Sequence, residues 1–223
     1  MNRPVNFDSI ALDNLLNDWI GALSEFSVSA VTVLGPDPFG SAHDRLVLAV
    51  HPPRLLPAAK ALAASDDFNV HWRSSDASLV VWQDLQRHDS EVSDQDWRGI
   101  WLHAGYRSLV RVEFSLPASR AFECFLFGER ALDRRVDATG VAWSTLNIWP
   151  LLRKCIAQAN SRLTAREIEC LSLAFQGKTA RQSSELLHCS ERTVGFHLAN
   201  AMNKLQADNK LAAVQRACWI GAL

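Results

Sequence analysis

The chain has 223 residues, of which 48% are hydrophobic and 21% charged, and this ordinary composition excludes a disordered, collagen-like or highly charged tail protein. Its net charge is −1, so it has no overall basic field, and any binding of nucleic acid must come from a local group of basic side chains. No apolar run reaches the roughly 18 to 20 residues of a membrane span, and the first residues lack the pattern of a secretory signal. We therefore expect a cytoplasmic protein with no membrane segment.

Charge and tryptophan are unevenly distributed along the chain. Residues 1–162 carry a net charge of −3, whereas residues 163–223 carry +2, and seven of the eight tryptophans lie before residue 150. Such an asymmetry indicates two units with different roles. We predict an α/β domain over residues 1–158, a linker over 159–162 and a second domain over 163–223.

The N-terminal part alternates between helical and extended patterns. The expected elements are, in chain order, a helix over 10–23, strands over 28–34 and 45–50, helices over 55–64 and 94–104, strands over 107–116 and 121–127, and a helix over 139–159. The strand over 121–127 is apolar on both faces, which is typical of a central strand covered on both sides by helices. The pattern predicts an α+β fold, an antiparallel sheet flanked by helices.

This order of elements resembles the sensor domains of the GAF and PAS kind and the ligand domains of LuxR-type regulators. The resemblance implies a small molecule held between the sheet and the middle helices, in an apolar pocket with a few polar anchors. It would bring together the aromatic side chains Trp72, Trp82, Trp97, Trp101 and Tyr106. The alternative interpretation is that these are ordinary core and surface aromatics.

The sequence indicates neither an acyl-homoserine-lactone ligand nor a phosphorylated receiver domain. Acyl-homoserine-lactone receptors among these regulators carry a W-x-x-x-Y cluster followed by an Asp-Pro pair, and residues 69–89 here contain neither. The resemblance therefore does not extend to a lactone signal. A response-regulator receiver places an acidic pair at the end of its first strand, but the first strand here ends Val33-Leu34-Gly35-Pro36.

No catalytic or metal-binding pattern is present in the sequence. The polar candidates have no recognised spacing: His51, His71, His88, His103, Asp84 and Cys124. Cys124 lies in an apolar strand, where burial would raise the thiol pKa. The five cysteines are widely spaced, odd in number and without CxxC, so we expect small buried hydrophobes. We predict no enzyme activity, no metal and no cofactor.

The C-terminal part has the signals of four short helices. Thr164 and Glu167 form a capping box, and Gly177 ends the first helix. Thr179 caps a second helix that ends at Leu187, and Ser190 caps a third that runs to about Leu205. Asp208 or Asn209 caps a fourth. Two helices joined by a three-residue turn form a helix-turn-helix, whose second helix enters the major groove of DNA.

These residues are similar to the LuxR/NarL-type DNA-binding domain over the whole tail. The matching positions are Leu163-Thr-x-Arg-Glu-x-Glu-x-Leu171, Gly177-Lys178-Thr179, Ser190-Glu-Arg-Thr-Val194, His197, Asn200, Met202, Lys204-Leu205 and Asn209. The resemblance implies a homodimeric transcription factor that reads an inverted repeat in double-stranded DNA. It implies DNA contacts from Lys178, Thr179, Thr193 and Lys204, and the outward positions of the third helix add Arg192, Phe196, Asn200 and Asn203.

The sequence departs from the family pattern at the recognition helix. Basic residues usual in the family are replaced by Gly195 and Ala199, which weakens the phosphate contacts that dominate affinity. In the second helix of the tail, the scaffold helix of the motif, Ser183 and Ser184 replace the apolar pair that is usual in the family. Two hypotheses remain: a regulator that senses a small molecule or partner and prefers A·T-rich sites, or an anti-activator that acts through heterodimers.

Overall fold

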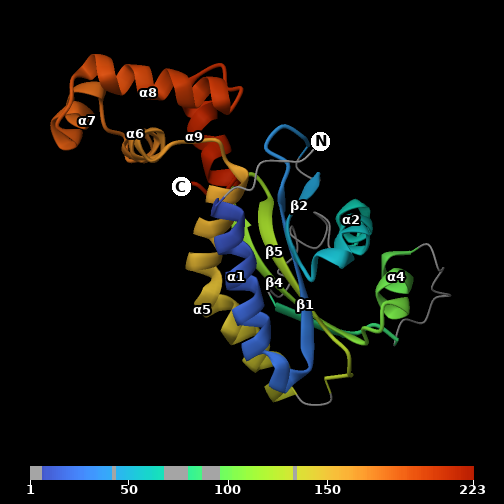
Figure 1. The fold of residues 1–223 in the computed structure, drawn as a ribbon. Coiled ribbons are helices and arrows are strands. Elements are labelled where there is room, and N and C mark those ends of the chain that lie inside the picture. The colour runs from blue at the N-terminus through green and yellow to red at the C-terminus, as the bar shows by residue number, and fades with distance from the viewer. Residues whose placement is uncertain (1–6, 42–43, 68–79, 87–95, 133–134) are drawn as a thin grey trace. The chain divides into compact units, whose positions relative to one another are not determined.

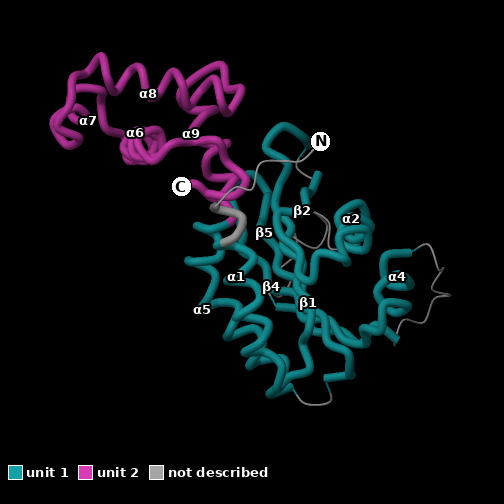
Figure 2. The backbone as a smooth tube through the Cα atoms, viewed as in Figure 1, with its two compact units in different colours: residues 1–155 teal, residues 156–223 magenta. Residues whose placement is uncertain are grey.

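The computed structural model describes residues 7–41, 44–67, 80–86, 96–132 and 135–223 (Figure 1). The chain divides into two compact units, residues 1–155 and 156–223 (Figure 2). The last helix of the first unit, α5, continues to Asn160, so half of the linker expected over 159–162 is helical. The connection without helical structure covers residues 161–164.

A five-stranded antiparallel sheet forms the centre of the first unit, in the order β2-β1-β5-β4-β3. The strands are β1 (Val28–Pro36), β2 (Arg45–His51), β3 (Val80–Asp84), β4 (Ser108–Leu116) and β5 (Arg120–Gly128). The two expected hairpins, β1–β2 and β4–β5, are confirmed. In the second, Ala118 and Ser119 both adopt positive φ, the backbone of a tight turn that matches the twist of its strands.

The central strand of this sheet is β5, and all nine of its residues are buried, as the two-sided apolar pattern predicts. Edge strand β3 was not expected from the sequence. It has only five residues, and its side chains are half-buried or exposed, so it lacks the long alternation that marks β4.

Helices cover both faces of the sheet (Figure 1). On one face lie α1 (Phe7–Ala22) and α5 (Arg135–Asn160), which are joined by a hydrogen bond from Trp19 Nε1 to Ser144 Oγ at 3.0 Å. On the other face lie α2 (Leu56–Ala64) and α4 (Trp97–His103). Two short 3-10 helices, η1 (Ser24–Phe26) and η2 (Pro53–Leu55), precede β1 and α2. None of the described helices is long and apolar enough to cross a membrane.

The second unit consists of four helices, which confirms an α+β chain with a helical C-terminal domain. They are α6 (Ala165–Phe175), α7 (Ala180–Leu187), α8 (Glu191–Lys204) and α9 (Lys210–Trp219). Its buried core is made of small and aliphatic side chains: Leu171, Ala201, Leu205, Ala207, Ala213, Val214 and Ala217. These side chains come from α6, α8, α9 and the α8–α9 turn, so three helices share one core.

Candidate functional site

A three-residue turn joins α7 to α8. His188 ends α7 in the left-handed conformation, with φ of 52°. The backbone N–H of Cys189 donates to the Ser184 carbonyl at 3.0 Å, and the Ser190 hydroxyl accepts from the Thr193 N–H at 3.0 Å. The end of α7 and the start of α8 therefore each gain a local hydrogen bond from the turn.

One face of α8 is exposed along its whole length. Its residues recur at three- and four-residue spacings: Arg192, Gly195, Phe196, Ala199 and Asn203. The opposite side carries Val194 and Ala201, both fully buried. Helical periodicity thus separates a packing face from a free face. The free face bears the single cation Arg192, and Phe196 is 62% exposed on it.

The other predicted DNA-binding residues lie around the start of the two helices. Lys178 is half-buried in the loop before α7, and Thr179 caps α7 by accepting from the Gln182 N–H at 3.2 Å. The Thr193 hydroxyl lies 2.8 Å from that of Ser190, so it takes part in the cap of α8. Asn200 is half-buried on the flank of the free face.

Lys204 makes an ion pair within the second unit. Its Nζ donates to Glu167 Oε2 at 2.8 Å, which links the end of α8 to the start of α6. Burial alone would raise the pKa of Glu167, but hydrogen bonds from Lys204 and Thr164, together with the Lys204 charge, hold it below its usual value. In the capping box, Glu167 accepts from the Thr164 N–H at 2.7 Å. Lys204 therefore has a structural role in addition to any contact with phosphate.

A pH-dependent loss of stability should follow from this pair. Because the Glu167 pKa is lower in the folded state than in the unfolded chain, its contribution is complete above the unfolded pKa and declines as the pH falls through the folded one. We expect Glu167→Gln to destabilise the protein at pH 7, with a difference from wild type that shrinks below about pH 4.5. Urea unfolding followed by circular dichroism between pH 7 and 3 measures this difference. A constant difference across that range would contradict it.

Ser183 and Ser184 are buried in α7, as the sequence implies. The Ser184 hydroxyl donates to the Arg181 carbonyl one turn earlier, at 2.7 Å. This local bond satisfies a hydroxyl that would otherwise be costly at a packing position. It explains how the scaffold helix tolerates a polar residue there.

Three of the five predicted ligand-binding aromatics lie together between α4 and the sheet. Trp101 stacks on Phe127 with ring centroids 3.5 Å apart, and Tyr106 meets both rings edge-on. Trp97 is also buried, and its Nε1 donates to Asp67 Oδ2 at 2.6 Å. Trp82 is 39% exposed on edge strand β3.

The fifth residue, Trp72, lies outside the described residues.

A buried ionic network occupies the same face of the sheet. Arg111 Nε donates to Glu123 Oε1 at 2.9 Å, and Arg111 also pairs with Glu113. Arg45 Nη1 lies 3.4 Å from Glu123 Oε2, and Arg45 also donates to the Leu62 carbonyl at 3.1 Å. Sequence reasoning missed this network. The sequence does place opposite charges on two adjacent predicted strands. Predicting which of these charges form ion pairs requires the register of the two strands, which the sequence alone does not give.

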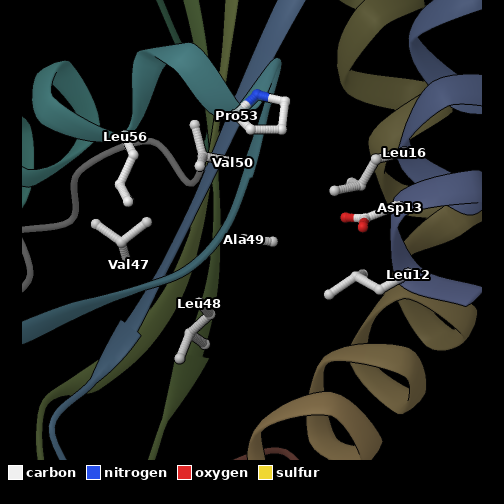
Figure 3. Close-up of a pocket in the computed structure, with 9 residues that line it drawn as sticks. All are labelled: Leu12, Asp13, Leu16, Val47, Leu48, Ala49, Val50, Pro53 and Leu56. Carbon is white, nitrogen blue, oxygen red and sulfur yellow. The ribbon is translucent and has the colours of Figure 1, made fainter. Parts of the chain in front are cut away.

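An open pocket of about 320 Å³ lies between α1 and edge strand β2 (Figure 3). Leu12, Asp13 and Leu16 line it from α1, and the rest of the lining comes from β2 and the segment that follows. Asp13 is its one charged lining residue. None of the four predicted ligand-binding aromatics that the structure describes lines this pocket.

The nucleophile candidate Cys124 is fully buried in β5. Burial, reinforced by the charge of Glu123, raises its pKa far above the usual thiol value. A thiol in that state is not a nucleophile at neutral pH. Among the described residues, no group of three or more His, Cys, Asp or Glu side chains could hold a metal ion.

The helix-turn-helix of the second unit is a DNA-binding motif, and function is argued from this site and not from the fold of the first unit. The model of the bacterial regulatory proteins of the luxR family matches residues 161–217. The chain is 44% identical over 172 residues to the transcriptional activator SolR of Ralstonia nicotianae, covering 70% of this chain and 69% of SolR. It is 34% identical over 155 residues to the activator AnoR of Acinetobacter nosocomialis, covering 65% of this chain and 63% of AnoR.

The chain belongs to the LuxR family of bacterial transcriptional regulators. An alignment that covers 70% of the chain cannot lie within the second unit alone, so the relationship includes part of the first unit. This is a family of regulators and not of enzymes, and the relatives named here give no support to an anti-activator. The crystal structure of Escherichia coli SdiA aligns with 95% of this chain and 91% of its own at 17% identity, with a TM-score of 0.46, a likeness too distant to carry an argument.

Proposed function

We propose that this regulator acts in the cytoplasm as a homodimer, reading an inverted repeat with the exposed face of α8. The observation that carries the proposal is the free face of α8 behind a capped three-residue turn. Arg192 would bind phosphate or guanine, Phe196 would contact thymine methyl groups, and Asn200 and Asn203 would read adenine. Contacts with the phosphate backbone of the DNA, which fix the position of the protein on the duplex, would come from Lys178, Thr179, Thr193 and Lys204.

DNA binding should be salt-sensitive and dependent on Arg192. We expect Arg192→Ala to weaken binding roughly tenfold or more at 0.1 M salt and to reduce the salt slope by about two per dimer, because one phosphate contact is lost in each subunit. Site selection from random duplexes at low salt, followed by fluorescence anisotropy, tests this. Arg54→Ala, an exposed arginine of the first unit, is the control. Failure to enrich any palindromic sequence would exclude the proposed function.

The homodimer would be formed in part by the outer face of α5. This helix exposes four large apolar side chains within 16 residues: Val136 at 74%, Trp143 at 63%, Leu146 at 44% and Leu151 at 52%. Exposed apolar residues gathered on one helix mark interaction surfaces. A second copy of the same helix would cover them symmetrically.

Trp143→Glu should therefore weaken self-association. A buried charge in place of a central aromatic is expected to raise the dimer dissociation constant at least tenfold. Sedimentation velocity at micromolar protein, compared with the exposed α1 variant Asn17→Glu, measures it. If the Trp143→Glu protein dimerises like wild type, α5 is not part of the dimer interface.

The N-terminal unit would sense a small molecule between the sheet and helices α2 and α4. Support comes from Trp97, Trp101 and Tyr106, which this face brings together as the sensor-domain resemblance implies. A ligand that binds one arrangement of the protein better than another would shift its population and so control DNA binding.

A further inference from the structure

The pocket between α1 and edge strand β2 has no part in the functions proposed above (Figure 3). Its volume of about 320 Å³ is at the lower end of the range found for small-molecule sites. The aromatic side chains of the proposed sensing face, Trp97, Trp101 and Tyr106, do not line it. The pocket is therefore a separate site, and its own lining residues indicate what it can bind.

A β-bulge in β2 accounts for the space. Val47 lies opposite Leu34 and Ala49 lies opposite Val33, so Leu48 is an extra residue without a partner on β1. An extra residue in one strand of an antiparallel pair bends that strand and increases its twist. Because β2 is at the edge of the sheet, the bend disturbs only its pairing with β1. We attribute the gap between α1 and β2 to this bend.

The pocket is lined almost entirely by aliphatic side chains. Eight of the nine lining residues are apolar, and none of these eight side chains carries a hydrogen-bond donor. Leu12, Leu16 and Ala49 supply buried surface, and Leu56 is 39% exposed. Such a lining favours a compact apolar body, which would lose its contact with water there.

The ninth lining residue is Asp13 of α1. Figure 3 shows its carboxylate directed from the helix toward β2. Burial lowers the pKa of His51, at the end of β2, and the charge of Asp13 opposes that shift, so the carboxylate lies close to the strand. Among the described residues, no lysine or arginine forms an ion pair with Asp13. The pocket therefore combines an apolar wall with one uncompensated negative charge.

We propose that this pocket binds a small organic cation, an ammonium group carried on a compact aliphatic body. The ammonium group pairs with the Asp13 carboxylate, and the body packs against Leu12, Leu16 and Ala49. The cation carries a single charge, because a second ammonium group would lose its water against aliphatic side chains with no carboxylate to pair with it. An anion of the same shape is repelled by Asp13.

The test uses the full chain and four probes, three of which share one ring and one methylene arm. These three are cyclohexylmethylamine, cyclohexylmethanol and cyclohexylacetate, and the fourth is 1,4-diaminobutane, a cation without an apolar body. Titrations at pH 7 and low salt, followed by saturation-transfer NMR, give the affinities. We expect the amine to bind about threefold to fivefold more tightly than the alcohol, because an exposed ion pair contributes modestly. The carboxylate should bind more weakly than the alcohol, and 1,4-diaminobutane should not bind.

Two variants of α1 show whether the preference comes from this pocket. Asp13→Asn keeps the shape of the side chain and removes its charge, so the amine and the alcohol should then bind equally well. Asp18→Asn, which removes an exposed carboxylate of the same helix outside the pocket, should leave the preference unchanged. A preference for the amine that survives in Asp13→Asn would overturn the proposal, as would absence of amine binding to wild type at millimolar concentration.

Two further variants test the apolar wall. Ala49→Leu adds bulk inside the pocket and should weaken the amine and the alcohol alike, at least tenfold. Leu56→Ala removes an exposed part of the lining, with less risk to folding, and should weaken both about threefold. Thermal melting shows whether each variant is folded, and unchanged probe binding in both would place the probes elsewhere and overturn the proposal.

Sedimentation velocity distinguishes a small ligand from a second copy of the chain. We expect Ala49→Leu to self-associate like wild type. Weaker self-association of this variant would mean that the pocket belongs to a contact between copies, and the small-molecule proposal would fail. Because all these measurements follow binding to the full chain without DNA, their outcome is independent of the proposed regulator function.

Discussion

Gly195→Arg is expected to tighten DNA binding roughly 10- to 100-fold at 0.1 M salt and to make the salt slope steeper by about two per dimer. The position lies on the free face of α8, next to Phe196 and one turn from Ala199. A cation there would neutralise one more phosphate in each subunit, and counterion release then strengthens binding. The result would restore the basic side chain that the family pattern leads us to expect.

The structure leaves room for this substitution. A Cβ atom added at Gly195 would meet nothing within 4 Å, and its backbone is helical. Glycine inside a helix costs roughly 1 kcal/mol relative to alanine, so the variant should also be somewhat more stable than wild type. Stability and charge therefore change together and must be separated.

Two controls separate them. Gly195→Ala should raise the free energy of unfolding by roughly 1 kcal/mol and leave the salt slope unchanged. Ala64→Arg adds the same charge at an exposed position of α2 and should change neither quantity by much. Fluorescence anisotropy against the selected site between 50 and 300 mM salt gives the slopes. An unchanged slope in Gly195→Arg would mean that this face of α8 does not lie against phosphate.

Glu123→Ala is expected to reduce the free energy of unfolding of the first unit by roughly 3 to 5 kcal/mol. Glu123 is fully buried, and the substitution would leave Arg111 and Arg45 with an uncompensated positive charge in the interior. Total stabilities of roughly 5 to 15 kcal/mol make this loss a large fraction of the whole. The carboxylate is required because its partners cannot return to water in the folded state.

Tryptophan fluorescence during urea unfolding measures this loss, because seven of the eight tryptophans lie before residue 150. The matched control is Glu129→Ala, an exposed carboxylate that accepts a hydrogen bond from Ser29 at 2.7 Å, and it should cost less than about 1 kcal/mol. A small effect of Glu123→Ala would show that water or a rearranged side chain replaces the carboxylate.

Local signals in the sequence predict the helices of the second unit. Caps at Thr164, Thr179 and Ser190 occur where the sequence predicts them, and of the two candidates for the fourth cap, Asp208 and Asn209, the structure selects Asn209. Each cap joins residues three positions apart, so it needs no knowledge of distant contacts. The structure added the ion pair between Glu167 and Lys204, whose partners are 37 positions apart.

The sequence predicts the first unit less completely. The two hairpins and the central strand follow from apolar alternation, but edge strand β3 is too short and too exposed to give a clear pattern. The alternating pattern of β4 also places Arg111 and Glu113 on the opposite face from their apolar neighbours. It does not predict whether that face is exposed to water or buried. Both residues are buried, because α2 and α4 cover that face.

By itself, the sequence determined the family, the division into two units and the free face of the recognition helix, since these depend on residues close together along the chain. Only the tertiary structure decided which side chains of the sheet share the interior of the first unit. Strand register pairs Arg111 with Phe125 and Glu113 with Glu123, and brings Thr32 within one row of the ring under Trp101. Such pairings depend on how strands far apart in the sequence are aligned, and no local pattern contains that alignment.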